Sequence, residues 1–485
     1  MEEFVVKTQD LNINATSPHQ EMLVEYFDRL APERAHWMAR NYYYHQQLAR
    51  IFSFFIPAGR SVLEVGSGIG RLLNAVKPGR GLGLDVSPKM VEIARAGHPH
   101  LEFRVEDVER LQTEEKFEYV IASDLIGFLY DVQQSFENLH RVCMPHTRIV
   151  ISGYNFVWEP LVRLAEKLGL KARQPIQNWL GMADVENLLE LAGFEIIRRN
   201  SRLLLPKSVP LLSELCNRLL VNLPVFKHLG LVFTLVARPK PLLSQSRHSC
   251  SVIVPCRNER GNVEAVAQRT PEIGAHTELI FVEGNSSDGT AEEIQRVIAK
   301  YPEKDIKFMK QDGKGKGDAV RKGFAAARGD VLMILDADLT IPPEVLPKFF
   351  EALVCGRGEF IHGSRLIYPM EKQAMRFLNL LANKFFSVVF TYLLDQRFKD
   401  TLCGTKVLFR RDYELLAANR AYFGDFDPFG DFDLIFGAAK LNLKIVEIPV
   451  HYRERTYGMT NISRFRHGCL LLRMSFHAMR KIKFV

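Results

Sequence analysis

The chain has 485 residues, which is too many for one ordinary hydrophobic core, so two or three domains are expected. With 47% hydrophobic and 25% charged residues, its composition is typical of a soluble globular protein. The net charge of +8 suits anionic ligands or a membrane surface and does not by itself indicate nucleic acid. Seven scattered cysteines without a CxxC pair indicate neither a disulfide framework nor a structural zinc site, and they favour a reducing cytosolic compartment.

Neither a signal peptide nor a membrane-spanning helix is expected. The first residues are acidic and polar, and no stretch reaches the roughly eighteen uninterrupted apolar residues that a spanning helix needs. Residues 239–249 combine two prolines and three serines between two β-like runs, which predicts a linker. Strands alternate with helical patterns on both sides, so we expect two different α/β domains, at 1–238 and 250–485.

The first chemical motif is the stretch SVLEVGSGIGRL at 61–72. It predicts a strand, a glycine-rich turn and the start of a helix, an arrangement that lets a ligand approach the backbone and the helix amides. A dinucleotide fingerprint would need glycine at position 71, where Arg71 stands. The spacing is E-x-G-x-G-x-G, formed by Glu64, Gly66, Gly68 and Gly70.

Carboxylates follow the next two predicted strands. The strand within 81–87 ends on Asp85, where a carboxylate can bind both hydroxyls of a ribose. Residues 101–105 form a third strand, followed by Glu106 and Asp107, which are placed to meet an adenine amino group. Three strand ends in this order indicate a nucleoside-binding site.

Over residues 40–238 the sequence resembles the class I S-adenosylmethionine-dependent methyltransferases, which have a Rossmann-like fold. The turn after the fourth strand, at 123–126, lacks the Asn/Asp-Pro-Pro-aromatic motif of enzymes that methylate amino groups of bases. A small-molecule or lipid-linked methyl acceptor is therefore favoured over nucleic acid. The resemblance implies cofactor-binding roles for Glu64, Gly66, Gly68 and Gly70 at the methionine part, Asp85 at the ribose, and Asp107 and Val108 at the adenine.

The methyl-acceptor pocket is left open by the sequence. The aromatic stretch at 39–48 could cover the cofactor or pack within an N-terminal helix. The apolar insert at 203–226 could line a greasy acceptor site or form a buried helical hairpin. No catalytic base is named, because methyl transfer from a sulfonium can proceed by proximity and orientation.

In the C-terminal half, polar groups again follow successive strands. A strand ending at Pro255 is followed by Glu259, and the next strand ends at Glu283. The run DVLMILDADLT then places Asp336 and Asp338 at the end of a third strand. Open α/β sheets bind ligands at this edge, and two neighbouring carboxylates suit Mg²⁺ or Mn²⁺ bridging a diphosphate.

Over residues 250–461 the sequence closely resembles family 2 glycosyltransferases of the GT-A fold, in the dolichol- or polyprenyl-phosphate mannose synthase branch. The final motif of that family, E-x-P…R-x-x-G-x-S-K, is matched by EIPVHYRERTYGMTN at 447–461. Two departures stand out: Glu283-Gly284 replaces a paired Asp-Asp, and Thr460-Asn461 replaces Ser-Lys in the final motif. These departures leave the base preference open and weaken the case for a phosphate acceptor. The resemblance implies Pro255, Glu259, Glu283 and Asp288 near the nucleotide, Asp336 and Asp338 at the metal, and Arg365 and Arg455 at phosphates, although Asp288 could equally be a helix N-cap.

The sugar acceptor and the C-terminal tail each allow two interpretations. A hydroxyl acceptor needs a general base, for which Asp433 is the candidate, whereas a phosphate acceptor needs none. The tail at 464–485 carries basic and interleaved apolar residues without an acid. It could lie on a membrane as an amphipathic helix or pack on its own domain.

The predicted protein is a bifunctional enzyme with two α/β domains. Metal-dependent, inverting transfer of a sugar from a nucleotide-sugar to a polyprenyl-phosphate or small-molecule acceptor is expected from the second domain. The first is expected to methylate with S-adenosylmethionine; the alternative is that it only binds a ligand or a partner. The expected location is the cytoplasm or the inner face of the membrane, with peripheral membrane contact and no nucleic acid. The donor sugar, the methylated atom and the order of steps stay open.

Overall fold

The computed structural model describes residues 18–175, 177–223, 226, 229–241, 247–366, 377–422, 432–453, 455, 457 and 464–483. The chain divides into two compact units. The first comprises residues 1–195, 201–217 and 225–239, and the second comprises 196–200, 218–224 and 240–485. Thr460 and Asn461 of the final motif lie outside the described residues.

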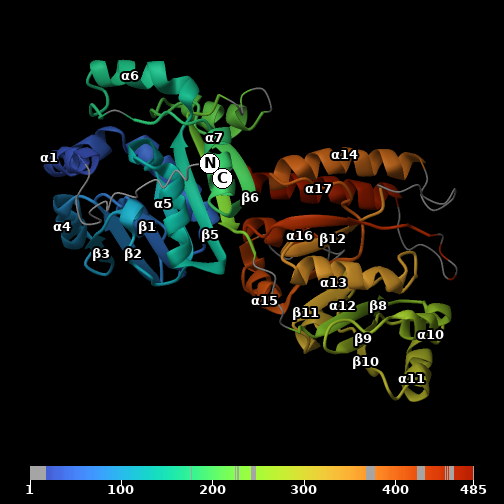
Figure 1. Ribbon diagram of the computed structural model, residues 1–485. Helices are drawn as coiled ribbons and strands as arrows, with labels where there is room; N and C mark the ends of the chain where they lie inside the picture. The colour runs from blue at the N-terminus through green and yellow to red at the C-terminus, as the bar shows by residue number, and fades with distance from the viewer. Residues whose placement is uncertain are drawn as a thin grey trace, which may run out of the picture. The chain divides into compact units, whose positions relative to one another are not determined.

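A seven-stranded sheet organises the first unit, in the order β3-β2-β1-β4-β5-β7-β6. The strands from β3 to β5 are parallel, and β7 joins β5 in the antiparallel sense, as expected for the closing strands of this fold. The strands are β1 (Ser61–Val65), β2 (Arg80–Asp85), β3 (Glu102–Val105), β4 (Phe117–Ser123), β5 (Cys143–Tyr154), β6 (Phe194–Arg202) and β7 (Val232–Pro239). Figure 1 shows them within the blue-to-green part of the chain.

Along the chain, helices both precede and follow the glycine turn. The long first helix is fixed to the β2–α4 connection, because Asp28 accepts hydrogen bonds from the Ser87 hydroxyl (2.5 Å) and the Lys89 amide (3.2 Å). The helices are α1 (Pro18–Arg40), α2 (Tyr42–Phe55), α3 (Arg71–Ala75), α4 (Pro88–Gly97), α5 (Val132–Asn138), α6 (Glu159–Lys167), α7 (Met182–Leu191) and α8 (Leu212–Glu214). The N-terminal helix is thereby held beside α4, which it contacts.

The second unit contains another seven-stranded sheet, in the order β10-β9-β8-β11-β13-β12-β14. The four strands from β10 to β11 are parallel, so their carboxyl ends share one edge. Strand β13 is antiparallel to both of its neighbours, which makes the sheet mixed. The strands are β8 (Cys250–Cys256), β9 (Thr277–Glu283), β10 (Asp305–Lys310), β11 (Val331–Ile334), β12 (Phe360–Ser364), β13 (Lys406–Phe409) and β14 (Ile445–Pro449).

The helices of the second unit include three that begin at that carboxyl edge, α10, α11 and α12. In Figure 1 the last helix, α17, runs beside α14, which it contacts. The helices are α10 (Arg260–Arg269), α11 (Thr290–Lys300), α12 (Lys316–Ala326), α13 (Leu346–Val354), α14 (Phe377–Leu394), α15 (Arg410–Ala418), α16 (Phe432–Lys440) and α17 (Arg464–Ile482).

The tail helix α17 has one packed face. Leu471, Met474, Ala478 and Ile482 are buried, at helical spacing, while Phe476 is 61% exposed. This geometry matches the interpretation in which the tail packs on its own domain. Within the described part of the chain, no helix is both long enough and apolar enough to cross a bilayer.

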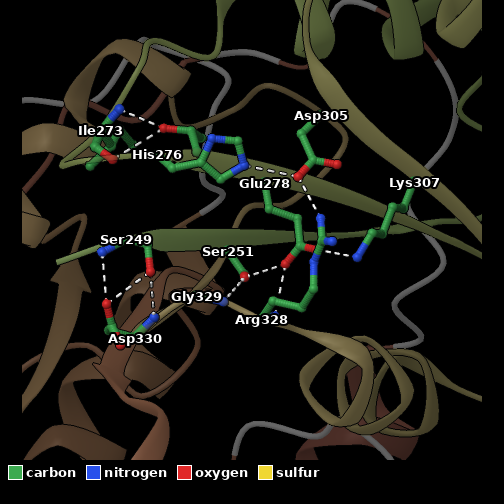
Figure 2. Close-up of polar contacts among 11 residues, drawn as sticks. Ser249, Ser251, Ile273, His276, Glu278, Asp305, Lys307, Arg328, Gly329 and Asp330 are labelled. Carbon is green, nitrogen blue, oxygen red and sulfur yellow. Dashed lines mark hydrogen bonds and ion pairs between the residues drawn. The ribbon is translucent and has the colours of Figure 1, made fainter.

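The opposite edge of the second sheet is closed by a polar network (Figure 2). The Glu278 carboxylate accepts hydrogen bonds from the Ser251 hydroxyl at 2.5 Å and from Arg328 at 3.0 Å, and it pairs with Lys307. Although burial opposes ionisation, these donors lower the pKa of Glu278 to about 2. The amino ends of the strands are thus tied together by ion pairs, and the carboxyl ends are left for a ligand.

Candidate functional sites

The glycine turn follows β1 in the conformation that only glycine adopts without strain. Gly66, Gly68 and Gly70 all have positive φ, at 71°, 52° and 76°. A Cβ atom on Gly68 would meet nothing within 4 Å, so this backbone faces open space. Glu64 is buried beneath the turn and accepts a hydrogen bond from the Leu73 amide at 3.0 Å. Burial raises the pKa of Glu64 to about 8.

The carboxylates that follow β2 and β3 differ in their hydrogen-bond partners. Asp85 accepts hydrogen bonds from the amides of Gly68 at 2.7 Å and Ser87 at 3.0 Å, which fixes it against the glycine turn. Glu106 is used within its own loop, where it accepts bonds from Thr113 and its neighbour. Asp107 accepts one amide bond from Glu109, while its Oδ2 is buried without a hydrogen-bond partner. Asp107, rather than Glu106, is therefore the acid with an available oxygen.

Most of these groups, but not the predicted residues Glu64 and Gly70, line one cavity of about 380 Å³. Gly66, Gly68, Asp85, Asp107 and Val108 all border it, as the sequence leads one to expect. The buried Asp107 oxygen that lacks a donor fits an adenine amino group. The open backbone at Gly68 fits a ligand that lies close to the main chain. The residues present therefore fit S-adenosylmethionine.

A second set of polar groups lies on this cavity. Tyr44 comes from the aromatic stretch that could cover the cofactor or pack within a helix, whereas the sequence gave no role to Asp124 and Tyr154. Asp124 follows β4 with a φ of 53°, and the Tyr44 hydroxyl donates a hydrogen bond to its Oδ2 at 2.7 Å. Its Oδ1 is buried and has no hydrogen-bond partner, and burial raises its pKa. The ring of Tyr154, at the end of β5, stacks on Tyr44 with centroids 5.9 Å apart. This arrangement can accept a hydrogen bond or a proton from a methyl acceptor.

In the second unit, Asp336 is enclosed by a cation and a glycine. Its Oδ1 lies 2.6 Å from the Nζ of Lys316, at the start of α12. Burial opposes ionisation, but the charge and hydrogen bond of Lys316 together with the charges of Lys406 and Arg365 outweigh it and lower the pKa of Asp336. A Cβ atom added to Gly404 would lie 1.9 Å from Asp336 Oδ2, so the backbone there requires glycine. The sequence reasoning gave no role to Lys316 or Gly404.

Asp338 is joined to the loop after β8 through Arg455. Its Oδ2 lies 2.6 Å from Arg455 Nη2, and Arg455 Nη1 lies 3.5 Å from Glu259 Oε1. The other oxygen of Asp338 accepts bonds from the amide and the hydroxyl of Thr340. Burial raises the pKa of Glu259 to about 7, with Asn262 and Arg455 acting against it. Three segments far apart in the chain therefore meet at Arg455.

The remaining predicted nucleotide residues lie at the same edge. Glu283 ends β9 opposite Cys256 and accepts a hydrogen bond from the Ser286 amide. Pro255 pairs with β9 one position earlier. Asp288 accepts amide bonds from Thr290 at 3.1 Å and Arg260 at 3.2 Å, at the starts of α11 and α10. It ties two helix N-termini together, and such termini attract phosphate.

Two predicted residues are engaged in ion pairs. Arg365 is buried and binds both oxygens of Asp400 at 2.8 Å, which lowers the pKa of Asp400 to about 2 against the effect of burial. Asp433 lies 3.1 Å from Arg420 and 3.3 Å from Arg321, so two guanidinium groups hold its carboxylate. Both guanidinium groups contact the same oxygen, Oδ2, of this carboxylate.

The Asp336–Asp338 pair can hold a divalent cation. One or two carboxylates commonly form the protein's part of a Mg²⁺ site that a diphosphate and water complete. Lys316 and Arg455 neutralise the two carboxylates and would move aside for a metal. Among the described residues, no group of three or more His, Cys, Asp or Glu side chains forms a fuller metal site.

Each half of the chain is similar to known proteins. Residues 251–415 match the model of glycosyl transferase family 2, and residues 62–146 match that of a methyltransferase domain. A dolichol-phosphate mannosyltransferase of Pyrococcus furiosus is 39% identical over 136 residues, which is 28% of this chain and 38% of that protein. The chain spans about two fifths of the length of the curated mannosyltransferases that it matches.

Solved structures similar to the chain fall into the same two groups. One is an S-adenosylmethionine-dependent methyltransferase of Thermotoga maritima, with 15% identity and a TM-score of 0.36, over 44% of this chain and 99% of the other. Another is glucosyl-3-phosphoglycerate synthase of Mycobacterium tuberculosis, solved with Mn²⁺ and uridine diphosphate. It has 16% identity and a TM-score of 0.36, over 48% of this chain and 80% of the other.

Proposed function

From a chain that carries a methyltransferase domain and a family 2 glycosyltransferase domain, we propose a bifunctional enzyme. Its second unit transfers a sugar from a nucleotide-sugar to a polyprenyl phosphate, and its first unit methylates with S-adenosylmethionine. The observation that carries the proposal is that each unit has its own set of strand-end ligand groups. The names of relatives, which include dolichol- and undecaprenyl-phosphate transferases, support a polyprenyl-phosphate acceptor.

The pairing of Asp433 also favours a phosphate acceptor over a hydroxyl. A phosphate oxygen is already anionic and attacks the anomeric carbon without losing a proton. The bond from that carbon to the diphosphate breaks, and the nucleoside diphosphate leaves. Asp433 is then free to keep its ion pairs with Arg420 and Arg321, and no general base is needed.

The residues around the donor diphosphate would orient and neutralise it. The N-termini of α10 and α11 point backbone amides toward the strand-end edge, where negative charge is favoured. A divalent cation held by Asp336 and Asp338 would supply electrostatic stabilisation of the leaving diphosphate. When Arg455 is released from Asp338, its guanidinium becomes available to a phosphate group.

Two variants test the two halves separately. Asp338→Asn should abolish transfer of radiolabelled sugar from a nucleotide-sugar panel to undecaprenyl phosphate, and chelator should do the same to the parent. Asp85→Ala should abolish S-adenosylmethionine binding in calorimetry and leave sugar transfer unchanged. Full sugar transfer by Asp338→Asn, or in chelator, would show that the two carboxylates do not hold a catalytic cation. Undiminished cofactor binding by Asp85→Ala would remove the methyltransferase assignment of the cavity.

A further inference from the structure

The methyltransferase unit exposes many large apolar side chains in two short segments. One segment surrounds α6, and the other precedes and includes α8. Leu161 is 56% exposed and Leu211 is 87% exposed. We call this set the apolar rim; its members are Phe156, Val157, Leu161, Leu164, Leu168, Leu170, Val209, Leu211, Leu212 and Leu215. The insert predicted as a cavity lining or a buried hairpin therefore contributes an exposed apolar surface.

The two segments adjoin the same cavity. Near α6, the Trp158 Nε1 donates a hydrogen bond to the Leu229 carbonyl at 2.8 Å, which ties the segment that follows the insert to the start of the helix. The cavity that borders Asp85 is lined by Leu161 from α6 and by Pro206 and Lys207 from the insert. The apolar rim is therefore continuous with the wall of the proposed methyltransferase site.

Helix α6 exposes leucines that an ordinary surface helix would bury. Leu161, Leu164 and Leu168 have the spacing of one helical face, and all three are exposed. The buried residue of α6 is Val162. Leu211 combines nearly full exposure with a φ of 61°, a conformation that leucine adopts only with strain. Apolar area kept in water at a cavity mouth is typical of a surface that binds a partner.

The charges around α6 indicate which partner. Glu166 is paired with Lys171 at 3.1 Å, and Glu159 is paired with Arg163. Over residues 156–173 the chain carries four basic residues, Arg163, Lys167, Lys171 and Arg173, against these two acids. The apolar stripe thus has an excess of positive charge beside it. Apolar side chains bordered by basic ones suit the interface of a membrane that contains anionic lipids.

We propose that the apolar rim docks on the hydrocarbon of an anionic membrane, and that the methyl acceptor enters the cavity while attached to a lipid of that membrane. The inference rests on the proposed methyl transfer. Leu161 belongs to both the rim and the cavity wall, so a hydrocarbon chain lying on the rim leads directly to the polar groups inside. A polar headgroup of this acceptor would meet the unpartnered Oδ1 of Asp124.

Tryptophan fluorescence tests the docking in the intact chain. All three tryptophans, Trp37, Trp158 and Trp179, are in the first unit, and the first two line the cavity. Vesicles of phosphatidylcholine and phosphatidylglycerol with brominated acyl chains should quench this fluorescence, because bromine quenches on close contact. High salt should weaken the quenching, since part of the attraction is screened charge.

The rim variant for this test is the triple change Val157→Gln, Leu164→Gln and Leu168→Gln, at three exposed rim residues that do not line the cavity, and it should lose most of the quenching. The matched control is Leu191→Gln, an exposed leucine on α7 that does not line the cavity, which should keep it. Leu211→Asn is a second variant. Asparagine tolerates a positive φ, so this change should not disturb folding. It should melt no lower than the parent and still bind vesicles more weakly.

The acceptor is tested with S-adenosylmethionine labelled in its methyl group. Undecaprenyl phosphate in the same vesicles is first incubated with the nucleotide-sugar that the chain uses, so that lipid-linked sugar is the methyl acceptor offered. Label should appear in the organic extract, and the triple rim variant should reduce it at least severalfold while cofactor binding stays unchanged. Label confined to water-soluble products would overturn the lipid-linked acceptor.

Other outcomes separate this inference from the proposed function. Absent quenching of the parent, or equal quenching of the triple variant and Leu191→Gln, would overturn the membrane docking. A concentration-dependent dimer that the triple variant abolishes, without quenching by vesicles, would show that the rim binds a second copy instead. If the parent fails to bind S-adenosylmethionine in calorimetry, the proposed methyl transfer fails, whatever the vesicles show.

Discussion

Replacing Glu64 with glutamine should remove a pH dependence from the stability of the methyltransferase unit. The Glu64 side chain is buried below the glycine turn, and its Oε2 accepts a hydrogen bond from the Leu73 amide. Glutamine preserves the size and the acceptor oxygen but cannot ionise. Burial raises the pKa of Glu64 from 4.5 to about 8, and nearby Asp85 adds to the rise. The folded state therefore holds a proton that the unfolded chain has released over this range.

The sign and the size follow from proton linkage. The contribution of neutral Glu64 to the free energy of unfolding is complete below pH 4.5. It is lost progressively as the pH rises from 4.5 through about 8. Each pH unit inside this window costs about 1.4 kcal/mol, and the cost levels off near the upper end. Between about pH 6 and about pH 8, the parent should therefore lose about 2 kcal/mol of unfolding free energy relative to Glu64→Gln.

Urea unfolding followed by tryptophan fluorescence measures this difference, because all three tryptophans belong to the first unit. The free energy of unfolding of parent and variant is compared at both pH values, so that groups common to both cancel. Glu102→Gln, at an exposed acid on β3, is the control and should follow the parent. If the difference in unfolding free energy between the parent and Glu64→Gln is the same at both pH values, Glu64 is not buried in a protonated state.

Three further outcomes are expected. Gly404→Ala should lower sugar transfer at least tenfold without altering S-adenosylmethionine binding, because the new Cβ would press on the Asp336 carboxylate; normal transfer would contradict this packing. Asp124→Asn should lower methyl transfer far more than cofactor affinity, and Tyr44→Phe should do so more mildly, as single-turnover assays with calorimetry can show. Deleting 464–483 should lower the melting temperature, since α17 has a buried face; an unchanged melting curve would restore the alternative of a surface-lying tail.

Much of both sites could be predicted from local sequence. A buried strand that ends in a carboxylate or a glycine turn is recognisable from a few residues, because the strand pattern and the change in polarity are local. Gly66, Gly68 and Asp85 border one cavity, and Asp336 and Asp338 follow the end of β11.

The partners of these groups could not be read in the same way. Arg365 and Asp400 are 35 positions apart, and Asp338 and Arg455 are 117 apart. Whether an arginine meets a phosphate or an aspartate depends on the segments brought beside it, and no spacing along the chain encodes that.

The sequence by itself determined the two α/β domains, the order of their strand-end motifs and the kinds of ligand that those motifs suit. Only the tertiary structure decided which acids keep an available oxygen. Glu106 is used up within its own loop while Asp107 is not, and Asp433 is held by two arginines. It also decided that the middle of the apolar insert, from Val209 to Leu215, exposes its large apolar side chains, with Leu211 in water. The physical reason is that hydrophobicity and charge are properties of single residues, whereas burial and pairing are properties of the neighbours that folding supplies.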